Sequence, residues 1–166
     1  MLLSFLFHFI FSEQDLDCIY DHNYKEYLFV YNSMCLVRCQ FRSLRSDSNG
    51  AAILIVIRNE HVLDSLIDDC KFIECSSSNG GAIYLNLLQK CKIKMQNTFF
   101  NKNSVQNEGG AIYCTSELQN NLELINCEFN ENCAHKSSYH GNTGVMYINN
   151  INYSIISTKI INNYAY

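Results

Sequence analysis

The sequence predicts an all-β fold, a right-handed parallel β-helix of about four to five coils, because two blocks of residues recur along the chain. One block is centred on glycine and the other on an aromatic residue, and each returns after about 30 residues. Between the blocks apolar and polar residues alternate, which is the period of strands and not of helices. One copy cannot bury its own apolar face, whereas stacked copies bury a continuous core.

The glycine block predicts a tight bend before one strand of each coil. Its four copies are Asn49-Gly-Ala-Ala-Ile53, Asn79-Gly-Gly-Ala-Ile-Tyr84, Glu108-Gly-Gly-Ala-Ile-Tyr113 and Thr143-Gly-Val-Met-Tyr147. Because glycine accepts positive φ and a close backbone approach, we expect Gly81 and Gly110 to take positive φ. The strands that follow are expected to turn their aliphatic residues inward and the tyrosines outward.

The second block predicts two short strands joined by a bend. Its copies are Cys39-Gln-Phe41, Cys70-Lys-Phe72, Thr98-Phe-Phe100, Cys127-Glu-Phe129 and Thr158-Lys-Ile160. Two apolar columns precede it, namely Leu36, Ile67, Met95, Leu124, Ile155 and Met34, Ser65, Ile93, Leu122, Tyr153. Three residues after it stand Leu44, Cys75, Asn103, Asn132 and Asn163. Asn tolerates the left-handed region, so these asparagines are interpreted as a solvated turn or turn ladder that bonds along the axis, not as ligands.

The length of the repeat suits one closed turn of the chain. Roughly 29 residues at about 3.3 Å each can trace three short strands and their bends. A leucine-rich repeat is the alternative, since Leu122-Glu-Leu124-Ile-Asn-Cys127 fits its pattern. The other copies lack those leucines, and that repeat gives no reason for the glycine block.

The chain is predicted to have three parts. Residues 1–14 are interpreted as a signal peptide, because the apolar run Met1–Phe11 is too short to span a bilayer, which needs roughly 20 residues. A buried first strand or cap is the alternative for this run. Residues 15–33 are expected to form an N-terminal cap or irregular first coil. Residues 34–166 are expected to hold the β-helix repeats, with an incomplete C-terminal coil.

Composition narrows the class of partner. The net charge of −4 is spread along the chain without a basic run, which argues against nucleic acid. The nine cysteines form no CxxC pair and no zinc-finger spacing. They are either partly paired, if the chain is exported, or small buried apolar residues. The sequence leaves both states open.

The two blocks together resemble a known repeat family. Gly80-Gly-Ala-Ile83 and Gly109-Gly-Ala-Ile112 alternate with Phe100-Asn-Lys-Asn103 and Phe129-Asn-Glu-Asn132. These GGAI and FxxN tetrapeptides are similar to the polymorphic outer membrane protein repeat of bacterial autotransporter stalks. The resemblance covers about residues 34–166 and implies a surface-exposed, often adhesive β-helix without catalysis. It does not extend to a translocating barrel or a membrane anchor, for which no segment is recognised.

No residue is singled out as catalytic, cofactor-binding or metal-binding. A carbohydrate-active β-helix needs clustered carboxylates, and Asp68-Asp69, the only adjacent acid pair, is interpreted as a solvated turn. His135 and His140 lie in the longest insertion and are interpreted as a surface loop, because two histidines and one cysteine make a weak ligand set.

The predicted function is therefore that of a non-catalytic, secreted or cell-surface adhesion or interaction module. A host-cell or matrix protein or a glycan is the expected partner, with no nucleic acid and no small-molecule cofactor. A degenerate pectate lyase-like enzyme and a purely structural stalk segment are the alternatives. The uncovered edge of the last coil also predicts end-to-end self-association.

Overall fold

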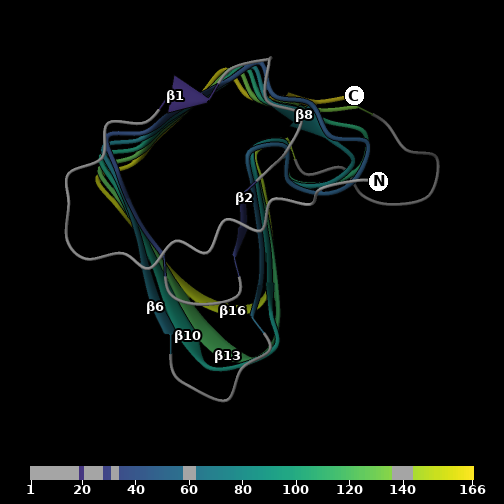
Figure 1. The fold of residues 1–166 in the computed structure, drawn as a ribbon. Helices are drawn as coiled ribbons and strands as arrows, with labels where there is room; N and C mark the ends of the chain where they lie inside the picture. The colour runs from purple at the N-terminus through teal and green to yellow at the C-terminus, as the bar shows by residue number, and fades with distance from the viewer. Residues whose placement is uncertain (1–18, 21–27, 31–33, 58–62, 136–143) are drawn as a thin grey trace, which may run out of the picture.

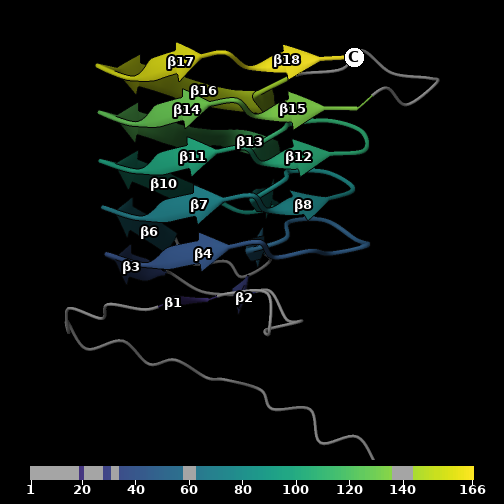
Figure 2. The ribbon, with the colours of Figure 1, turned by 90° about the horizontal axis from the view of Figure 1, so that it is seen from above.

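The computed structural model describes residues 19–20, 28–30, 34–57, 63–135 and 144–166, and these form a parallel β-solenoid of about 4 turns. The described residues include strands but no helix, which confirms the all-β prediction. A leucine-rich repeat that follows each strand with a helix is therefore excluded for these residues. Seen down the axis, the strands of successive coils superpose on one another (Figure 1). From the side the coils rise from β3 to β18, and the near strands run left to right, so the solenoid is right-handed (Figure 2).

The strands stack into three sheets. The first sheet contains β1 (Ile19–Tyr20), β4 (Gln40–Arg42), β7 (Lys71–Ile73), β11 (Phe99–Asn101), β14 (Glu128–Asn130) and β17 (Lys159–Ile161). The second contains β2 (Leu28–Val30), β5 (Ile53–Ile57), β9 (Ile83–Leu87), β13 (Ile112–Ile125), β10 (Cys91–Gln96), β6 (Leu63–Asp68) and β3 (Cys35–Val37), with β16 (Met146–Ile156) beside β13. The third contains β8 (Ser76–Ser77), β12 (Ser104–Val105), β15 (Cys133–Ala134) and β18 (Tyr164–Ala165).

The second sheet covers two sides of the coil, so a coil has four strand segments and not the three that were predicted. Strand β13 pairs with β9 through its first residues and with β10 through its last ones. The register between β13 and β16 shifts between Thr115 and Asn120, where the strand bends around the corner. The extra segment is the short strand of the third sheet. Its two residues are too few to show an alternation of apolar and polar residues in the sequence.

The predicted columns are confirmed by the register of the parallel strands. Leu36, Ile67, Met95, Leu124 and Ile155 are successive partners. Phe41, Phe72, Phe100 and Phe129 are each fully buried and stack with ring centroids 4.8, 4.9 and 4.6 Å apart. The repeat length in the sequence is therefore the length of one coil, and each of these side chains lies directly on the equivalent side chain of the neighbouring coil.

The asparagine column is buried, so of the two predicted forms, a solvated turn or a turn ladder, the structure shows the ladder. Asn103 and Asn132 are both 0% exposed. Asn103 donates from Nδ2 to Asn132 Oδ1 at 2.9 Å and to the Phe72 carbonyl at 3.0 Å, and Asn132 repeats the first bond to Asn163. The predicted bonding along the axis is thus present, but inside the coil.

At this corner the residue with a left-handed backbone conformation is the one directly before each asparagine. Lys102 and Glu131 have φ of 55° and 53°. A left-handed residue interrupts the alternation of side chains, so that the residue after it points inward. The spacing of the repeat located the corner correctly but could not show which of its two residues would turn.

The glycine bend also differs from the prediction by one residue. Gly80 and Gly109, the first of each pair, have φ of 61° and 71°, whereas Gly81 and Gly110 are not in the left-handed region. A Cβ on Gly81 would overlap the Gly110 carbonyl oxygen of the next coil, and one on Gly110 would overlap that of Gly144. The first glycine is required by its φ and the second by the close approach of two backbones.

The predicted N-terminal parts fall largely outside the described residues. Residues 1–14 are not among them, and of residues 15–33 the structure describes β1 and β2, which pair in parallel with β4 and β5. At the opposite end the last coil, residues 144–166, leaves β16, β17 and β18 as the outermost strands of the three sheets.

Candidate functional site

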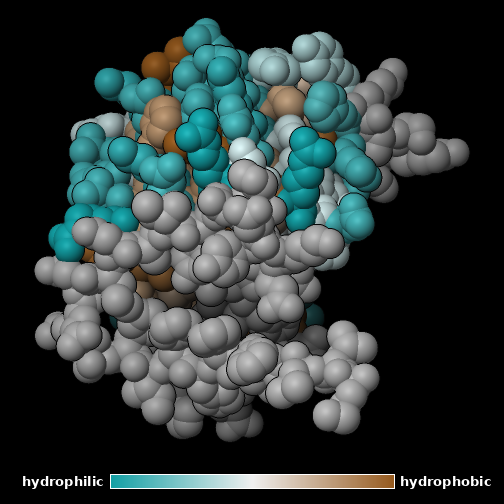
Figure 3. Space-filling model, turned by 45° about the horizontal axis from the view of Figure 1, so that its top comes forward, coloured by the Kyte–Doolittle hydropathy of each residue, from teal (hydrophilic) through white to brown (hydrophobic). Residues whose placement is uncertain are grey.

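The lateral faces carry the polar side chains that could meet a partner. Over the described residues, the face in Figure 3 is mostly hydrophilic, with a few apolar residues between the polar ones. Three ion pairs join neighbouring coils on the outside of the solenoid, Lys92 with Glu123 at 2.9 Å, and Lys102 with Glu131 and Lys159 with Glu128 at 3.8 Å. These pairs are exposed, so each adds little stability, and the alternation of sign leaves no single-sign patch along them.

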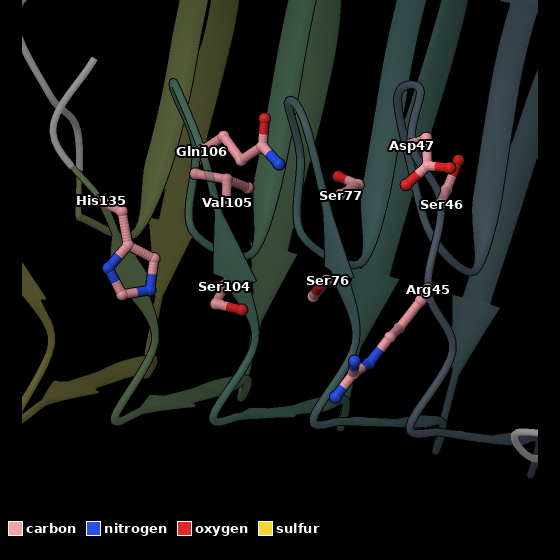
Figure 4. A pocket seen from close by; sticks show the side chains of 9 residues that line it. All are labelled: Arg45, Ser46, Asp47, Ser76, Ser77, Ser104, Val105, Gln106 and His135. Carbon is pink, nitrogen blue, oxygen red and sulfur yellow. The ribbon is translucent and has the colours of Figure 1, made fainter. Parts of the chain in front are cut away.

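A groove of about 370 Å³ runs along the corner formed by the third sheet. Its lining residues come from equivalent positions of successive coils (Figure 4): Arg45, Ser46, Asp47, Ser76, Ser77, Ser104, Val105, Gln106 and His135. The lining offers hydroxyl, amide and guanidinium groups together with one carboxylate. Such a surface can form several hydrogen bonds with an extended polar partner, whereas acid–base catalysis by paired carboxylates would need a second acid.

The serines of this corner are partly used by the fold itself. Ser77 Oγ donates to the carbonyl oxygens of Asn79 and Gly80 at 2.8 and 2.9 Å, which stabilises the approach to the glycine bend. Ser78 Oγ donates to the Asp47 carbonyl at 2.9 Å and so joins two coils. Arg45 and Gln106 are exposed and are the lining residues with the longest polar side chains.

A tyrosine stripe follows the outer face of the second sheet, as predicted. Tyr84, Tyr113 and Tyr147 stack with ring centroids 4.8 and 4.7 Å apart and are half-buried. Burial raises the pKa of Tyr113 to about 12 and also raises the pKa of Tyr84. The stripe therefore presents ring edges and hydroxyl groups on the outside of the coil.

Asp68, the first residue of the adjacent acid pair, belongs to an outer ladder of amide side chains. The Asp68 carboxylate accepts from Gln96 Nε2 at 2.7 Å and from Asn97 Nδ2 at 2.9 Å. Asn97 Oδ1 in turn accepts from Asn126 Nδ2 at 2.8 Å. Asp69 is exposed and takes a φ of 50° at the corner, which agrees with the predicted turn, although Asp68 is only half-exposed.

The histidine insertion is described only at its first end. His135 Nε2 lies 3.5 Å from Cys133 Sγ, and the His135 ring stacks on Tyr166 at 5.9 Å. His140 lies outside the described residues. Within the part of the chain that the structure describes, there is no group of three or more His, Cys, Asp and Glu residues placed to hold a metal ion.

The cysteines serve as small core residues along most of the coil. Cys70, Cys75, Cys91, Cys114, Cys127 and Cys133 are buried free thiols, Cys35 is an exposed one, and Cys39 is disulfide-bonded. Burial raises the pKa of Cys70 and Cys91 to about 11 and that of Cys75 to about 12. These buried thiols are therefore poor nucleophiles at neutral pH.

The stacked columns and coil corners define the class as a right-handed parallel β-solenoid of repeats. Residues 97–115 match the Chlamydia polymorphic membrane protein repeat, whose proteins are associated with the outer membrane and cell surface. The matched segment contains one complete pair of blocks, from Phe100 to Asn103 and from Gly109 to Ile112, so the predicted resemblance is confirmed there. No curated protein and no solved structure matches the chain. The described residues hold no helix that is long and apolar enough to cross a membrane.

Proposed function

We propose that this chain is a non-catalytic, secreted or surface-displayed β-solenoid module that binds a host-cell or matrix protein or a glycan through its third-sheet corner. The match of residues 97–115 to a repeat of surface proteins carries the proposal. The groove supports it, because Arg45 and Gln106 extend from a row of serines along several coils. Neither a cofactor nor nucleic acid is part of the proposal.

A binding comparison on the full chain tests this function. The probes are a glycan array and a panel of immobilised extracellular matrix proteins. Arg45→Ala and Gln106→Ala are expected to weaken binding by about 10-fold each, the loss of roughly one interaction of 1.4 kcal/mol. Lys94→Ala and Gln119→Ala remove a cationic group and an amide from other sides of the coil and are expected to leave binding unchanged.

A purely structural stalk segment is the second candidate, because the ladders are regular from coil to coil. Absence of binding to every probe, with the chain presented at high density, would favour the stalk. If the groove variants and the control variants lose binding equally, the groove is not the binding site. The chain would then still be an interaction module, but one that binds through another surface.

A further inference from the structure

The strands of one outer side of the solenoid carry no charged residue. This side is the first arm of the second sheet, formed by β5, β9, the start of β13 and the start of β16, whose strands superpose down the axis (Figure 1). The strands of the other sides include charged residues, such as Lys92 on the second arm and Lys159 on the first sheet, and Arg45 lies at the third-sheet corner. The outward side chains of the first arm, here called the neutral face, form two columns: Leu54, Tyr84, Tyr113 and Tyr147, and beside them Val56, Asn86, Thr115 and Asn149.

The fold does not use the polar groups of the neutral face. The hydroxyls of the tyrosine stripe, the Asn86 and Asn149 amides and the Thr115 hydroxyl have no hydrogen-bond partner within the described part of the chain. Outward amides on another side bond along the axis, as Asn126 does to Asn97 at 2.8 Å. On the neutral face Thr115 separates the two asparagines, so no such ladder forms. These side chains therefore present a regular array of groups that can donate and accept hydrogen bonds.

The array repeats once a coil, and this spacing favours one shape of partner. Neighbouring strands lie about 4.8 Å apart, so equivalent atoms two coils apart, such as those of Tyr84 and Tyr147, are separated by about 9.6 Å. A polyproline II helix has three residues per turn and rises about 3.1 Å per residue, so each of its sides recurs every ~9.3 Å. An α-helix repeats after about 5.4 Å, and residues three apart in a strand point to opposite sides. Of these regular forms, polyproline II matches the array best.

The chemistry of the neutral face fits the same conformation. A polyproline II segment has no internal hydrogen bonds, so its carbonyl oxygens can accept from the outward hydroxyl and amide groups. Proline is neutral, as both columns are, and aromatic-lined surfaces are an established way of binding proline-rich segments. A glycan fits less well, because sugars pack on the faces of aromatic rings. The rings of the stripe stack with centroids 4.8 and 4.7 Å apart, so both faces of Tyr113 are covered.

We propose that the neutral face binds a proline-rich segment of another protein in the polyproline II conformation, laid along the solenoid axis over the tyrosine stripe. Tyrosine hydroxyls two coils apart donate to carbonyl oxygens one turn apart in the segment, and Asn86, Thr115 and Asn149 contact its flank. Because such a segment is extended before it binds, little conformational entropy is lost. The neutral face and the third-sheet groove belong to different sheets, so this proposal does not depend on what the groove binds.

Fluorescence anisotropy on the full chain with a labelled peptide of about nine L-prolines tests the proposal. A peptide of D-prolines has the same composition and the opposite helical hand, and a Gly-Ser peptide of equal length is flexible. Both are expected to bind at least about 10-fold more weakly. Maltoheptaose, a neutral oligosaccharide, should not displace the L-proline peptide. Absence of binding, equal binding of the two hands, or displacement by the oligosaccharide would each overturn the proposal.

A conservative variant locates the contact. Tyr113→Phe removes one hydroxyl and keeps the stacked ring, and it should weaken binding of the L-proline peptide by about 3- to 10-fold, the loss of roughly one hydrogen bond. Tyr164→Phe removes a hydroxyl from an exposed tyrosine of the third sheet and is the matched control, for which no change is expected. Equal affinities of the two variants would show that the peptide does not bind at the tyrosine stripe.

An added charge gives a second, independent readout. Thr115→Lys places an unpaired charge in the neutral face and should weaken peptide binding by at least about 10-fold, because the ammonium group would lose water beneath the peptide. Ser154→Lys places the same charge on the second arm, beside Glu123, and should not. Arg45→Ala, in the groove, should also leave peptide binding unchanged, which separates this test from that of the groove. Equal losses in Thr115→Lys and Ser154→Lys would overturn the assignment to the neutral face.

Discussion

At the scale of single residues, the phenylalanine column provides the largest buried side chains of the solenoid. We predict that Phe100→Ala or Phe129→Ala lowers the free energy of unfolding by about 3–5 kcal/mol, because each ring is fully buried between its neighbours and leaves a cavity when removed. Lys102→Ala, at an exposed corner position, should change it by less than about 0.5 kcal/mol. Urea denaturation of the three variants measures this, and small equal shifts would contradict the inward packing of the rings.

The paired glycines give a second prediction at this scale. Gly81→Val and Gly110→Val should prevent native folding, because a side chain there would overlap the backbone of the next coil. Even Gly81→Ala should be strongly destabilising, since a single Cβ already meets the Gly110 carbonyl oxygen. Circular dichroism and thermal unfolding check this result. Native stability of the alanine variants would show that the coils are further apart than the structure has them.

At the scale of an element, the buried asparagine ladder holds one corner of every coil together. Asn132→Ala would leave the Asn103 N–H and the Phe100 carbonyl without their partner. Each buried group left unsatisfied costs about 1–3 kcal/mol, so we predict a marked loss of stability and faster hydrogen exchange at the Asn103 amide. Asn130→Ala removes an outward amide of the same coil and is the matched control. If both variants exchange alike, the ladder does not stabilise the corner.

The whole molecule contains enough buried thiols to give its stability a pH dependence. The pKa of Cys70, Cys75 and Cys91 rises from 9.0 to about 11, about 12 and about 11, first because burial disfavours the thiolate. Above pH 9 the unfolded chain therefore loses protons that the folded chain keeps, and the free energy of unfolding falls as the pH rises from about 9 to about 11. Below that window both states are protonated and the thiols contribute no slope.

Chemical denaturation between about pH 8 and about pH 11 measures this slope. The Cys75→Ala variant removes the thiol whose pKa is raised to about 12 and should show a shallower decline, whatever its absolute stability. The pKa of Tyr84 and Tyr113 is raised as well, so part of the decline should remain in this variant. A flat profile for the natural chain would contradict the burial of these groups.

The absence of catalysis is also a prediction about the whole molecule. Incubation with pectic, uronate-containing and neutral polysaccharides, with and without calcium, should give no turnover. The reason is that Asp68 is engaged by Gln96 and Asn97, and the groove is lined by a single carboxylate, Asp47. Reproducible turnover that Asp68→Asn or Asp47→Asn abolishes would show that the chain is an enzyme.

The sequence alone determined the solenoid, its coil length and its inward columns, because a repeat stacked on itself converts spacing along the chain directly into neighbours in space. Leu36, Ile67, Met95 and their equivalents could be aligned by counting, and the register confirms them. The outward position of the tyrosines followed from the same alternation. The resemblance to a repeat of surface proteins followed from the GGAI and FxxN tetrapeptides, and residues 97–115 match that repeat.

Only the tertiary structure decided what happens at the corners. Alternation has no period where the chain turns, so the sequence could not distinguish Lys102 from Asn103 as the left-handed residue, or Gly80 from Gly81. The groove from Arg45 to His135 has the same origin, because its lining residues come from corner positions that become neighbours only when the coils stack.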